Sequence, residues 1–553
     1  MNTILDARLL HADREAEVFC EFLQAGRTTS IRHGDLWREA ARYAHLFQRH
    51  GVPRGSVVVI ILRHSPELLY SFLGAMLAGA IPSFMPPPSA KQDPTHYWRS
   101  HEKLFERIGS GVLLTDGGSL AAVAQNLPRL SLHLLDAAEA AELPAQCDEV
   151  AVAADDIALL QHSSGTTGLK KGVALSHRAV LRQIASYRGA LGLRPDDRVV
   201  SWLPLYHDMG LIACFLLPLV TGTPVVMLDP FEWVVTPRRL FEAIQRFHGT
   251  LCWQPNFAFH HLCRTVRPAA DLDLSSMRAW IDCSEPCRAE TLQMFARTFC
   301  GAGVTVEQLQ VCYAMAETVF AVTQTPPGRP PRALHVNPEV LRTERRIVVA
   351  SEQDPSRQTF LSTGPVVPGL QVRIVDDAGA PQPADRIGIV AIAGDFLFDG
   401  YFKLEDETRR KLRDGWYRTG DLGFFHDGEL YVTGRAHDLI IVHGRNYYAH
   451  ELEYLVNQVP GVHPGRNVAA GWFKPEIGSE EIVVMAEIDS GAPVDRARLV
   501  QEIKQALLDH AGLLVYDVHL VGPGWLVKTT SGKISRSENL AKYLAAMTRA
   551  SAA

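Results

Sequence analysis

The segment QHSSGTTGLKKGV, residues 161–173, follows the apolar run IALL and precedes the helix-like run HRAVLRQIASY. This order is typical of a phosphate-binding loop, because glycines let backbone N–H groups approach phosphate oxygens while hydroxyls and a lysine add donors and charge. The spacing does not match the GxxxxGK[ST] pattern, so the loop is not a P-loop of that kind. A Ser/Gly turn without a ligand is the alternative for the segment taken alone. The predicted phosphate contacts are Ser163, Ser164, Gly165, Thr166, Thr167 and Lys171.

Short apolar runs separated by helix-length amphipathic segments surround this loop. They predict buried strands of βαβ units, with helices on both faces of mainly parallel sheets. The runs are residues 56–62, 111–116, 199–205 and 223–228. From about Leu370, DG and AG turns between shorter strands indicate a hairpin-rich β subdomain. A small α+β domain is expected after it. We therefore predict an α/β protein with an N-terminal domain over 1–436, subdivided at about 369/370, and a C-terminal domain over 437–553.

Composition excludes several other classes of protein. The 553 residues are 47% hydrophobic and 21% charged, which is typical of a soluble chain with more than one domain. A net charge of −6 does not suit nucleic-acid binding. The nine cysteines form no CxxC pair, so neither a disulfide framework nor a zinc site is predicted. The longest apolar stretch, 211–228, contains Pro218, Gly222 and Pro224, which favour a buried helix, turn and strand over a membrane span. With no export signal visible at the start, a cytoplasmic protein is expected.

Two polar clusters follow strand-like runs. In WLPLYHDMGL, residues 202–211, His207 is a candidate for lining a substrate entrance, and a histidine capped by Asp208 in a buried turn is an equal alternative. In VCYAMAET, Glu317 follows a strand near the sheet edge where α/β proteins usually bind ligands. A single carboxylate there is sufficient to hold Mg²⁺ together with nucleotide phosphates. The alternative is a solvated glutamate.

Two further clusters lie nearer the C-terminus. WYRTGDLG and GRAHDLIIVHGRN place Asp421 and Arg435 as candidates for binding a ribose, since a carboxylate accepts hydrogen bonds from two vicinal hydroxyls. VKTTSGKISRSENL places Lys533 in a Ser/Gly turn before a final helix, where it would be a counter-charge for phosphate. Each of these residues taken alone would be an ordinary surface charge.

In order along the chain, these five clusters resemble the core motifs of the acyl-adenylate-forming superfamily over residues 161–536. WLPLYHDMGL, QPNFAFHHL, CSEP at 283–286 and GRNYYAHELE are most similar to those of fatty acyl-AMP ligases, as is an extra segment at about 341–361. The resemblance implies an N-terminal domain of two mainly parallel sheets flanked by helices plus a smaller β subdomain, a mobile α+β C-terminal domain, and an active site between them. In that family the extra segment restrains the domain rotation that the coenzyme A step needs.

Carried over motif by motif, the resemblance assigns a role to each candidate residue. The phosphate loop and Lys533 would contact phosphates, His207 would act near the acid, and Asp421 and Arg435 would hold the ribose. Glu317 with Thr167 would bind Mg²⁺, and His437 would be the hinge. Glu285, Pro286 and Tyr313 would border adenine, and Ala314 and Met315 are further candidates for binding ATP or AMP. The apolar residues offered as an acyl tunnel, or else as ordinary core, are Trp202, Ile212, Phe215, Trp253 and Phe257.

The expected reaction is ATP-dependent activation of a medium- or long-chain fatty acid to acyl-AMP, with release of pyrophosphate. Transfer to the phosphopantetheine thiol of an acyl carrier protein would follow. An acyl-CoA synthetase that uses free coenzyme A is one alternative, and a catalytically silent nucleotide-binding homologue is another. Because carrier proteins are acidic, Lys528, Arg536 and Lys542 are candidates for steering them.

Overall fold

The computed structural model describes residues 1–88, 94–109, 111–163, 171–443, 445–477, 479–488, 495–528 and 534–552. The predicted site residues Ser164, Gly165, Thr166, Thr167 and Lys533 lie outside these ranges.

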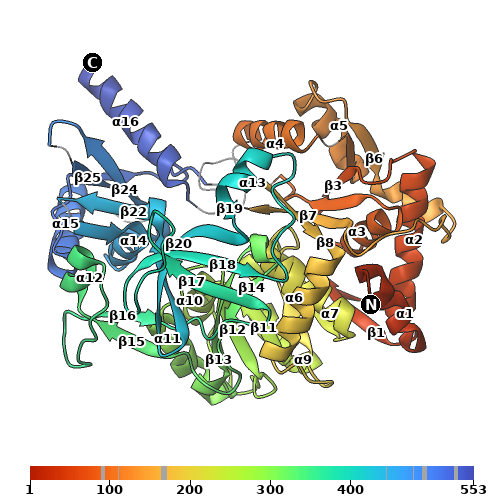
Figure 1. The fold of residues 1–553 in the computed structure, drawn as a ribbon, viewed down its shortest axis with the longest axis horizontal. Helices are drawn as coiled ribbons and strands as arrows, with labels where there is room; N and C mark the ends of the chain where they lie inside the picture. Colours follow the sequence, from red (N-terminus) through yellow and green to blue (C-terminus); the bar gives the residue numbers. More distant parts are fainter. Residues whose placement is uncertain are drawn as a thin grey trace.

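An eight-stranded sheet forms the centre of the N-terminal region (Figure 1). Its inner neighbours are parallel, and only the edge strands β14 and β2 pair antiparallel. The strands, in spatial order, are β14 (Ala321–Gln324), β13 (Leu309–Ala314), β12 (Ala279–Cys283), β11 (Leu251–Gln254), β9 (Val199–Ser201), β10 (Val225–Leu228), β1 (Val18–Gln24) and β2 (Arg27–Arg32). Strand β9 is shorter than the predicted strand over 199–205, because the chain turns after Ser201 towards Pro204, which has no N–H for a ladder.

Helices cover both faces of this sheet, as the alternation of side chains requires. The register pairs Trp253 with Ile281 and Cys252 with Trp280, so Trp253 and Trp280 point to opposite faces. Trp280 packs edge-on against Phe241 of α9 and Phe295 of α11, whereas Trp253 contacts Tyr187 of α6. The helices of this region are α6 (His177–Ala190), η4 (Met209–Leu216), α7 (Leu217–Thr221), α8 (Pro230–Val235), α9 (Arg238–Phe247), α10 (Asn256–Thr265) and α11 (Ala289–Phe299). The apolar stretch 211–228 thus forms helix, turn and strand as predicted.

A second, all-parallel sheet has the order β4-β3-β5-β6. Strand β3, VVVII, is buried on both faces: Val58 and Ile60 pack towards α2 and α3, while Val59 packs towards α4 and α5. A continuous apolar strand is the expected sequence for this position. The elements are β3 (Val57–Ile61), β4 (Ile81–Phe84), β5 (Val112–Thr115), β6 (His133–Asp136), α2 (His33–Arg49), α3 (Glu67–Leu77), α4 (Pro94–Ile108) and α5 (Gly117–Asn126). The antiparallel pair β7 (Ile157–Ser163) and β8 (Lys171–Ser176) flanks the predicted phosphate loop.

Antiparallel strands follow, as the DG turns predict. Strands β17 (Leu370–Val375), β18 (Gly388–Gly394), β20 (Trp416–His426), β21 (Glu429–Arg435) and the short β19 (Leu412–Arg413) form one sheet, with α13 (Glu405–Lys411) leading into β19. The hairpin β15 (Ala333–Val336) and β16 (Gln358–Leu361), with α12 (Pro338–Glu344) between its strands, shares a core with β20 and β21. The segment predicted as an insertion at 341–361 therefore lies within a folded unit.

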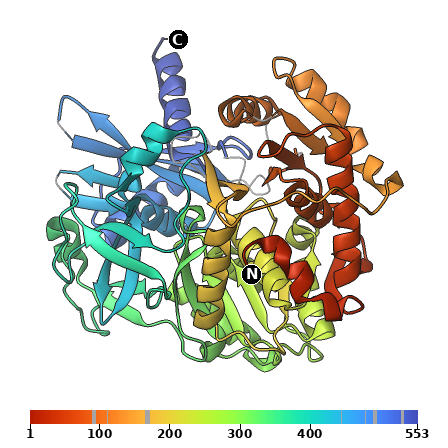
Figure 2. The same cartoon turned by 45° about the vertical axis from the view of Figure 1, so that its right-hand side comes forward.

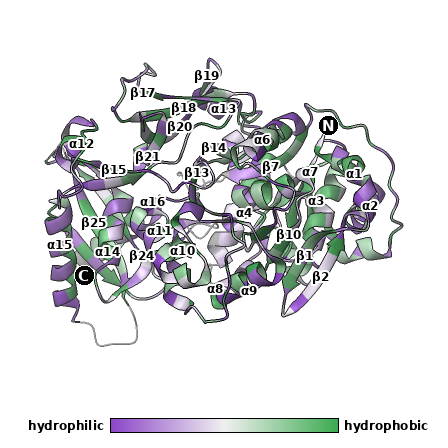
Figure 3. Cartoon of the chain, turned by 90° about the horizontal axis from the view of Figure 1, so that it is seen from below, coloured by the Kyte–Doolittle hydropathy of each residue, from purple (hydrophilic) through white to green (hydrophobic). Residues whose placement is uncertain are grey.

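The C-terminal elements form an α+β unit around a three-stranded sheet, β24-β25-β26, with its own cores. Figures 1 and 2 show it on the side of the molecule away from α1 and α2, and Figure 3 shows α15 with a polar outer surface. Its elements are β22 (Leu439–Val442), β23 (Arg445–Tyr448), α14 (Ala449–Asn457), β24 (Val462–Lys474), β25 (Ser479–Ile488), α15 (Arg496–Ala511), β26 (Asp517–Val521) and α16 (Arg536–Ala552).

The predicted α/β fold, with two sheets, a β subdomain and a C-terminal α+β unit, is confirmed. All nine cysteines are free thiols. Among the described residues, no helix has the length and apolar character that crossing a membrane requires.

Candidate active site

A strained turn after β13 presents Glu317. Residues 316–318 form a single 3-10 turn, and Val319 takes a φ of 65°, which a β-branched residue rarely adopts. The Phe320 N–H donates to the Thr318 carbonyl at 2.7 Å and closes the turn. Such strain persists only where the surroundings enforce it, and it is found most often at functional sites.

The Glu317 carboxylate is buried among tyrosines. Its Oε1 accepts a hydrogen bond from Tyr401 Oη at 2.7 Å, and the hydroxyls of Tyr401 and Tyr417 lie 3.3 Å apart. Burial and then the charge of Glu317 raise the pKa of both phenols above their usual value, so they remain neutral donors. Tyr401 thus engages one carboxylate oxygen of Glu317, Oε1.

Asp421 lies between Tyr313 and Arg435. The β20–β21 register places Asp421 directly opposite Arg435, and Arg435 Nε donates to Asp421 Oδ1 at 3.1 Å. Tyr313, from β13, donates through its hydroxyl to Asp421 Oδ2 at 2.6 Å. The charge of Asp421 raises the pKa of Arg435 above its usual value, despite burial. A carboxylate has about four lone-pair sites, so Asp421 keeps acceptor capacity beyond these two hydrogen bonds.

Lys171 begins β8 at the end of the predicted phosphate loop. Its ammonium pairs with the Glu407 carboxylate of α13 and lies 4.9 Å from the ring centre of Tyr401. Burial lowers the pKa of Lys171, and the nearby charge of Glu317 opposes this change. The structure therefore brings together Lys171 and Glu317, which are far apart in sequence.

The CSEP segment connects the sheet to α10 and to the HDMG turn. Glu285 Oε2 accepts a hydrogen bond from the Phe257 N–H at 3.2 Å, and Ser284 takes a φ of 70°. Ser284 Oγ lies 4.0 Å from Met209 Sδ, which places the predicted adenine border beside the HDMG turn. In that turn Asp208 Oδ1 accepts the Met209 N–H at 2.8 Å and caps η4, a π-helix, a form often found at functional sites.

The remaining candidates for binding the nucleotide and for the hinge lie at the end of a strand or in segments that directly follow strands. Pro286 and His437 are exposed, and Ala314 and Met315 are half-buried between β13 and Glu317. The Met315 N–H donates to the Phe320 carbonyl at 2.9 Å across the strained turn. His207 is half-buried, with its ring 4.9 Å from that of Tyr206.

Of the five apolar residues proposed as an acyl tunnel, Trp202, Ile212, Phe215 and Trp253 lie in one hydrophobic core, whereas Phe257 is 47% exposed. Trp202 stacks on Trp233 at 3.6 Å, with Phe257 edge-on at 6.1 Å. Trp253 Nε1 instead donates to Tyr187 Oη at 2.8 Å, under α6. Phe215 packs near Phe19 and Phe72, and Ile212 is also fully buried. Burial, together with the neighbouring Cys312 and Cys283 thiols, raises the pKa of Tyr187, the hydrogen-bond partner of Trp253.

Sequence reasoning missed Tyr401, Tyr417 and Lys411, which surround Glu317. Tyr401 directly follows Asp399-Gly400, a turn signal that was available, whereas Lys411 ends an ordinary charged helix. Within the part of the chain that the structure describes, no group of three or more histidines, cysteines or acidic residues is placed to hold a metal.

Comparisons with known proteins identify the family of this chain. The model of the family "AMP-binding enzyme" matches residues 8–402. The medium-chain-fatty-acid–acyl-carrier-protein ligase JamA of Moorena producens is 30% identical over 548 residues, covering 95% of this chain and 92% of the relative. A long-chain-fatty-acid–AMP ligase of Mycolicibacterium smegmatis is 30% identical over 555 residues, covering 90% and 86%. A structure from work on fatty acyl-adenylate ligases of E. coli and L. pneumophila aligns with a TM-score of 0.91 and 27% identity, covering 100% of this chain and 98% of that one.

The fold, the charged cluster around Glu317 and Asp421, and these relatives define an AMP-forming acid ligase. The chain belongs to the AMP-binding enzyme family. The enzymes of this class use ATP, and fatty acyl-AMP ligases are among the relatives of this chain.

Proposed function

We propose that this enzyme converts a medium- or long-chain fatty acid and ATP into acyl-AMP and then transfers the acyl group to the phosphopantetheine thiol of an acyl carrier protein. The substrate class is supported by two relatives that are named for medium- and long-chain fatty acids. The carrier step is supported by the name of one of them and by the contacts of the 333–361 segment described below.

In the first step a carboxylate oxygen bonds to the α-phosphorus as the bond to pyrophosphate breaks. Both reactants are anionic, so the site must neutralise and position charge. Lys171, paired with Glu407, and Arg435, paired with Asp421, supply fixed cations, and we assign Lys533 to the acyl and phosphate oxygens. Loss of one such contact typically costs about 3 kcal/mol, roughly a hundredfold in rate.

The residues present fit Mg²⁺. Glu317 Oε2 is the oxygen not engaged by Tyr401, and one carboxylate with nucleotide phosphates is a common Mg²⁺ arrangement. We assign Glu317 to hold the ion, with Thr167 as the second predicted ligand. Bound Mg²⁺ would neutralise charge on the phosphate oxygens.

The observation that favours a carrier protein over free coenzyme A is a set of contacts between the β15–α12–β16 unit and the C-terminal unit. Glu339 Oε1 pairs with Arg445 Nη2 at 2.9 Å, and Asn446 Nδ2 donates to the Arg342 carbonyl at 2.7 Å. Gln358 Nε2 donates to the Glu451 carboxylate. These contacts resist rotation of the C-terminal unit, which is the movement that the coenzyme A step needs in the family.

Arg288, which ends the CSEPCR segment (residues 283–288), makes a further contact with the C-terminal unit. Arg288 Nη2 donates to the His450 carbonyl at 3.1 Å, and its guanidinium stacks over the Tyr454 ring at 3.9 Å. Its own backbone N–H donates to Asn256 Oδ1 at 3.2 Å. The segment that would border adenine is thus tied directly to α14.

The test incubates the enzyme with ATP, Mg²⁺ and a panel of carboxylic acids, and follows acyl-AMP, acyl-CoA and acylated carrier in parallel. Adenylate that moves to a carrier but not to coenzyme A is the expected result. Rapid acyl-CoA formation would favour a synthetase, and no adenylate from any acid would favour a silent homologue. Lys533→Ala is the inactive control, and better use of short or aromatic acids would contradict the chain-length proposal.

Loosening the contacts of the β15–α12–β16 unit should increase transfer to coenzyme A. We expect Arg445→Ala combined with Gln358→Ala to raise the rate of acyl-CoA formation about tenfold, since two polar contacts of about 0.5–1.5 kcal/mol are lost. The initial rate of acyl-CoA formation measures this, with adenylate formation nearly unchanged. Arg498→Ala, which breaks an exposed pair with Glu502 on α15, is the matched control. An unchanged coenzyme A rate would show that these contacts do not decide the acceptor.

Arg536 and Lys542, which were proposed as carrier-steering cations, make contacts within the C-terminal unit. Arg536 pairs with Glu453 at 2.6 Å and with Asp438 at 2.8 Å, and Lys542 donates to the Trp525 carbonyl at 2.6 Å. The half-buried Arg536 is therefore a structural cation that links α16 to α14 and to residue 438, beside the predicted hinge. Lys542 stays exposed, so it remains a candidate for steering.

A further inference from the structure

Lys411 is the last residue of α13, immediately before β19 pairs with β20. Its side chain turns towards the site: a Cβ placed on Gly420 would lie 3.5 Å from Lys411 Nζ. Gly420 stands between Thr419 and Asp421, has a φ of 85°, and is the residue next to the proposed ribose-binding carboxylate. The ammonium of Lys411 is therefore held over the backbone that presents Asp421.

The charges around Lys411 come from both halves of the site. Lys171 and Arg410 repel its positive charge, while Glu317 and Asp421 attract it. Lys171 in turn is repelled by Arg410 and by Arg107 of α4. Burial, with these neighbouring cations, lowers the pKa of both Lys171 and Lys411. Lys411 thus lies between Lys171, at the end of the predicted phosphate loop, and Asp421, the predicted ribose ligand.

The acidic residue of α13 that faces this cluster is already engaged. Glu407 pairs with both Lys171 and Arg410. Among the described residues, Lys411 itself makes no ion pair within 4.0 Å. Gathering cations in a half-buried place costs free energy, which a bound polyanion would offset.

We infer that Lys411 binds the phosphate chain of ATP, and the pyrophosphate formed from it, between Asp421 and Lys171. This inference rests on the nucleotide site assigned under the proposed function, but not on which acid or acceptor the enzyme uses. Because the ammonium is a compact charge on a flexible side chain, it can keep its contact with the phosphates as pyrophosphate leaves.

The test measures binding of three probes to the full chain by calorimetry in the presence of Mg²⁺: ATP, inorganic pyrophosphate and adenosine. Lys411→Met keeps the length and apolar stem of the side chain and removes its charge. We expect ATP and pyrophosphate to bind about ten- to a hundredfold more weakly, the range for one charge-assisted contact, and adenosine to bind within twofold of wild type. Lys411→Arg should restore most of the pyrophosphate binding.

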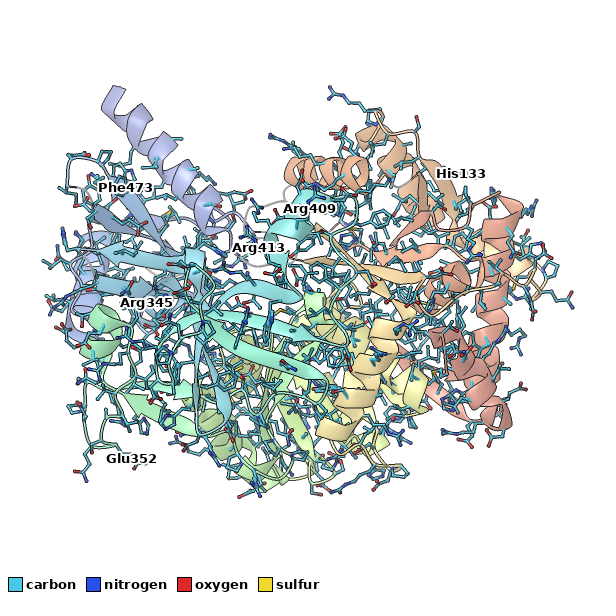
Figure 4. All side chains as sticks on the ribbon, in the orientation of Figure 1. His133, Arg345, Glu352, Arg409, Arg413 and Phe473 are labelled. Carbon is cyan, nitrogen blue, oxygen red and sulfur yellow. The ribbon has the colours of Figure 1, made fainter. Side chains whose placement is uncertain are left out.

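Arg409→Met is the matched control, because Arg409 lies on the same helix, is exposed, and pairs only with Asp406 among the described residues (Figure 4). It should leave all three affinities unchanged. Unchanged ATP and pyrophosphate binding by folded Lys411→Met would overturn the inference. An equal loss of adenosine binding would also overturn the inference, since it would show that Lys411 has a structural role. If Lys411→Met does not fold, the same measurements are made with Lys411→Gln. No acid or carrier is present, so a wrong acid or acceptor would not affect the result.

Discussion

Asp421→Asn should lower kcat/KM for ATP about a hundredfold. The Asp421 carboxylate accepts from Tyr313 Oη at 2.6 Å and from Arg435 Nε at 3.1 Å, and we assign its remaining lone pairs to the ribose hydroxyls. An asparagine offers one acceptor oxygen in place of two, and its NH₂ group faces either the Tyr313 hydroxyl or the Arg435 guanidinium. The guanidinium would also lose its counter-charge, which adds to the cost.

Steady-state kinetics with ATP and with 2′-deoxy-ATP measure this effect. The wild type should discriminate between the two nucleotides, and Asp421→Asn should lose most of that discrimination, because the hydroxyl contact would be gone in both cases. Asp427→Asn in the β20–β21 turn is the matched control, since its φ of 48° suits asparagine. A kcat/KM within threefold of wild type would remove Asp421 from the nucleotide site.

Arg278→Met should destabilise the folded protein by about 3–5 kcal/mol. Asp197 is buried, and its carboxylate accepts from Arg278 Nε at 3.0 Å and Nη2 at 2.6 Å, as well as from Thr250 Oγ1 and the Arg194 N–H. Without Arg278 this charge would be left buried and without its cation. Asp197, Thr250 and Arg278 lie just before β9, β11 and β12, at the N-terminal ends of these parallel strands. The candidate active site lies at the opposite ends, so activity per folded molecule should be unchanged.

Denaturant unfolding as a function of pH gives a second readout. Burial would raise the pKa of Asp197, but hydrogen bonds from Arg278, the Arg194 N–H and Thr250 outweigh it and lower the pKa below its usual value. A carboxylate with a lowered folded-state pKa stabilises the protein above its unfolded pKa of about 3.9, and this contribution is lost as pH falls through the folded value. The difference in free energy of unfolding between wild type and Arg278→Met should therefore have its full value at pH 7 and decrease below about pH 4. A constant difference across this range would contradict the role of the ion pair.

Local sequence patterns predicted the elements and much of the site. The VVVII run predicted a buried strand, because short runs of β-branched residues without polar positions are typical of one, and the structure buries all five residues. The turns around 378–379 and 427–428 predicted hairpins, and the structure has β17–β18 and β20–β21 there. The motifs around Glu317, Asp421 and Arg435 stand out because each places a charged residue within or directly after a strand.

The sequence by itself determined the α/β class, the order of elements and the family, since periodicity, turn residues and motif order are properties of neighbouring residues. Only the tertiary structure decided which side chains meet. Tyr401 reaches Glu317 across 84 residues and Tyr313 reaches Asp421 across 108, and Lys411 becomes part of the site through the pairing of β19 with β20. The same packing buries four of the five apolar residues proposed as one tunnel in a single core and leaves Phe257 47% exposed. The physical reason is that an apolar or charged pattern determines which face of an element is buried, whereas the partner of that face is decided by how distant elements pack together.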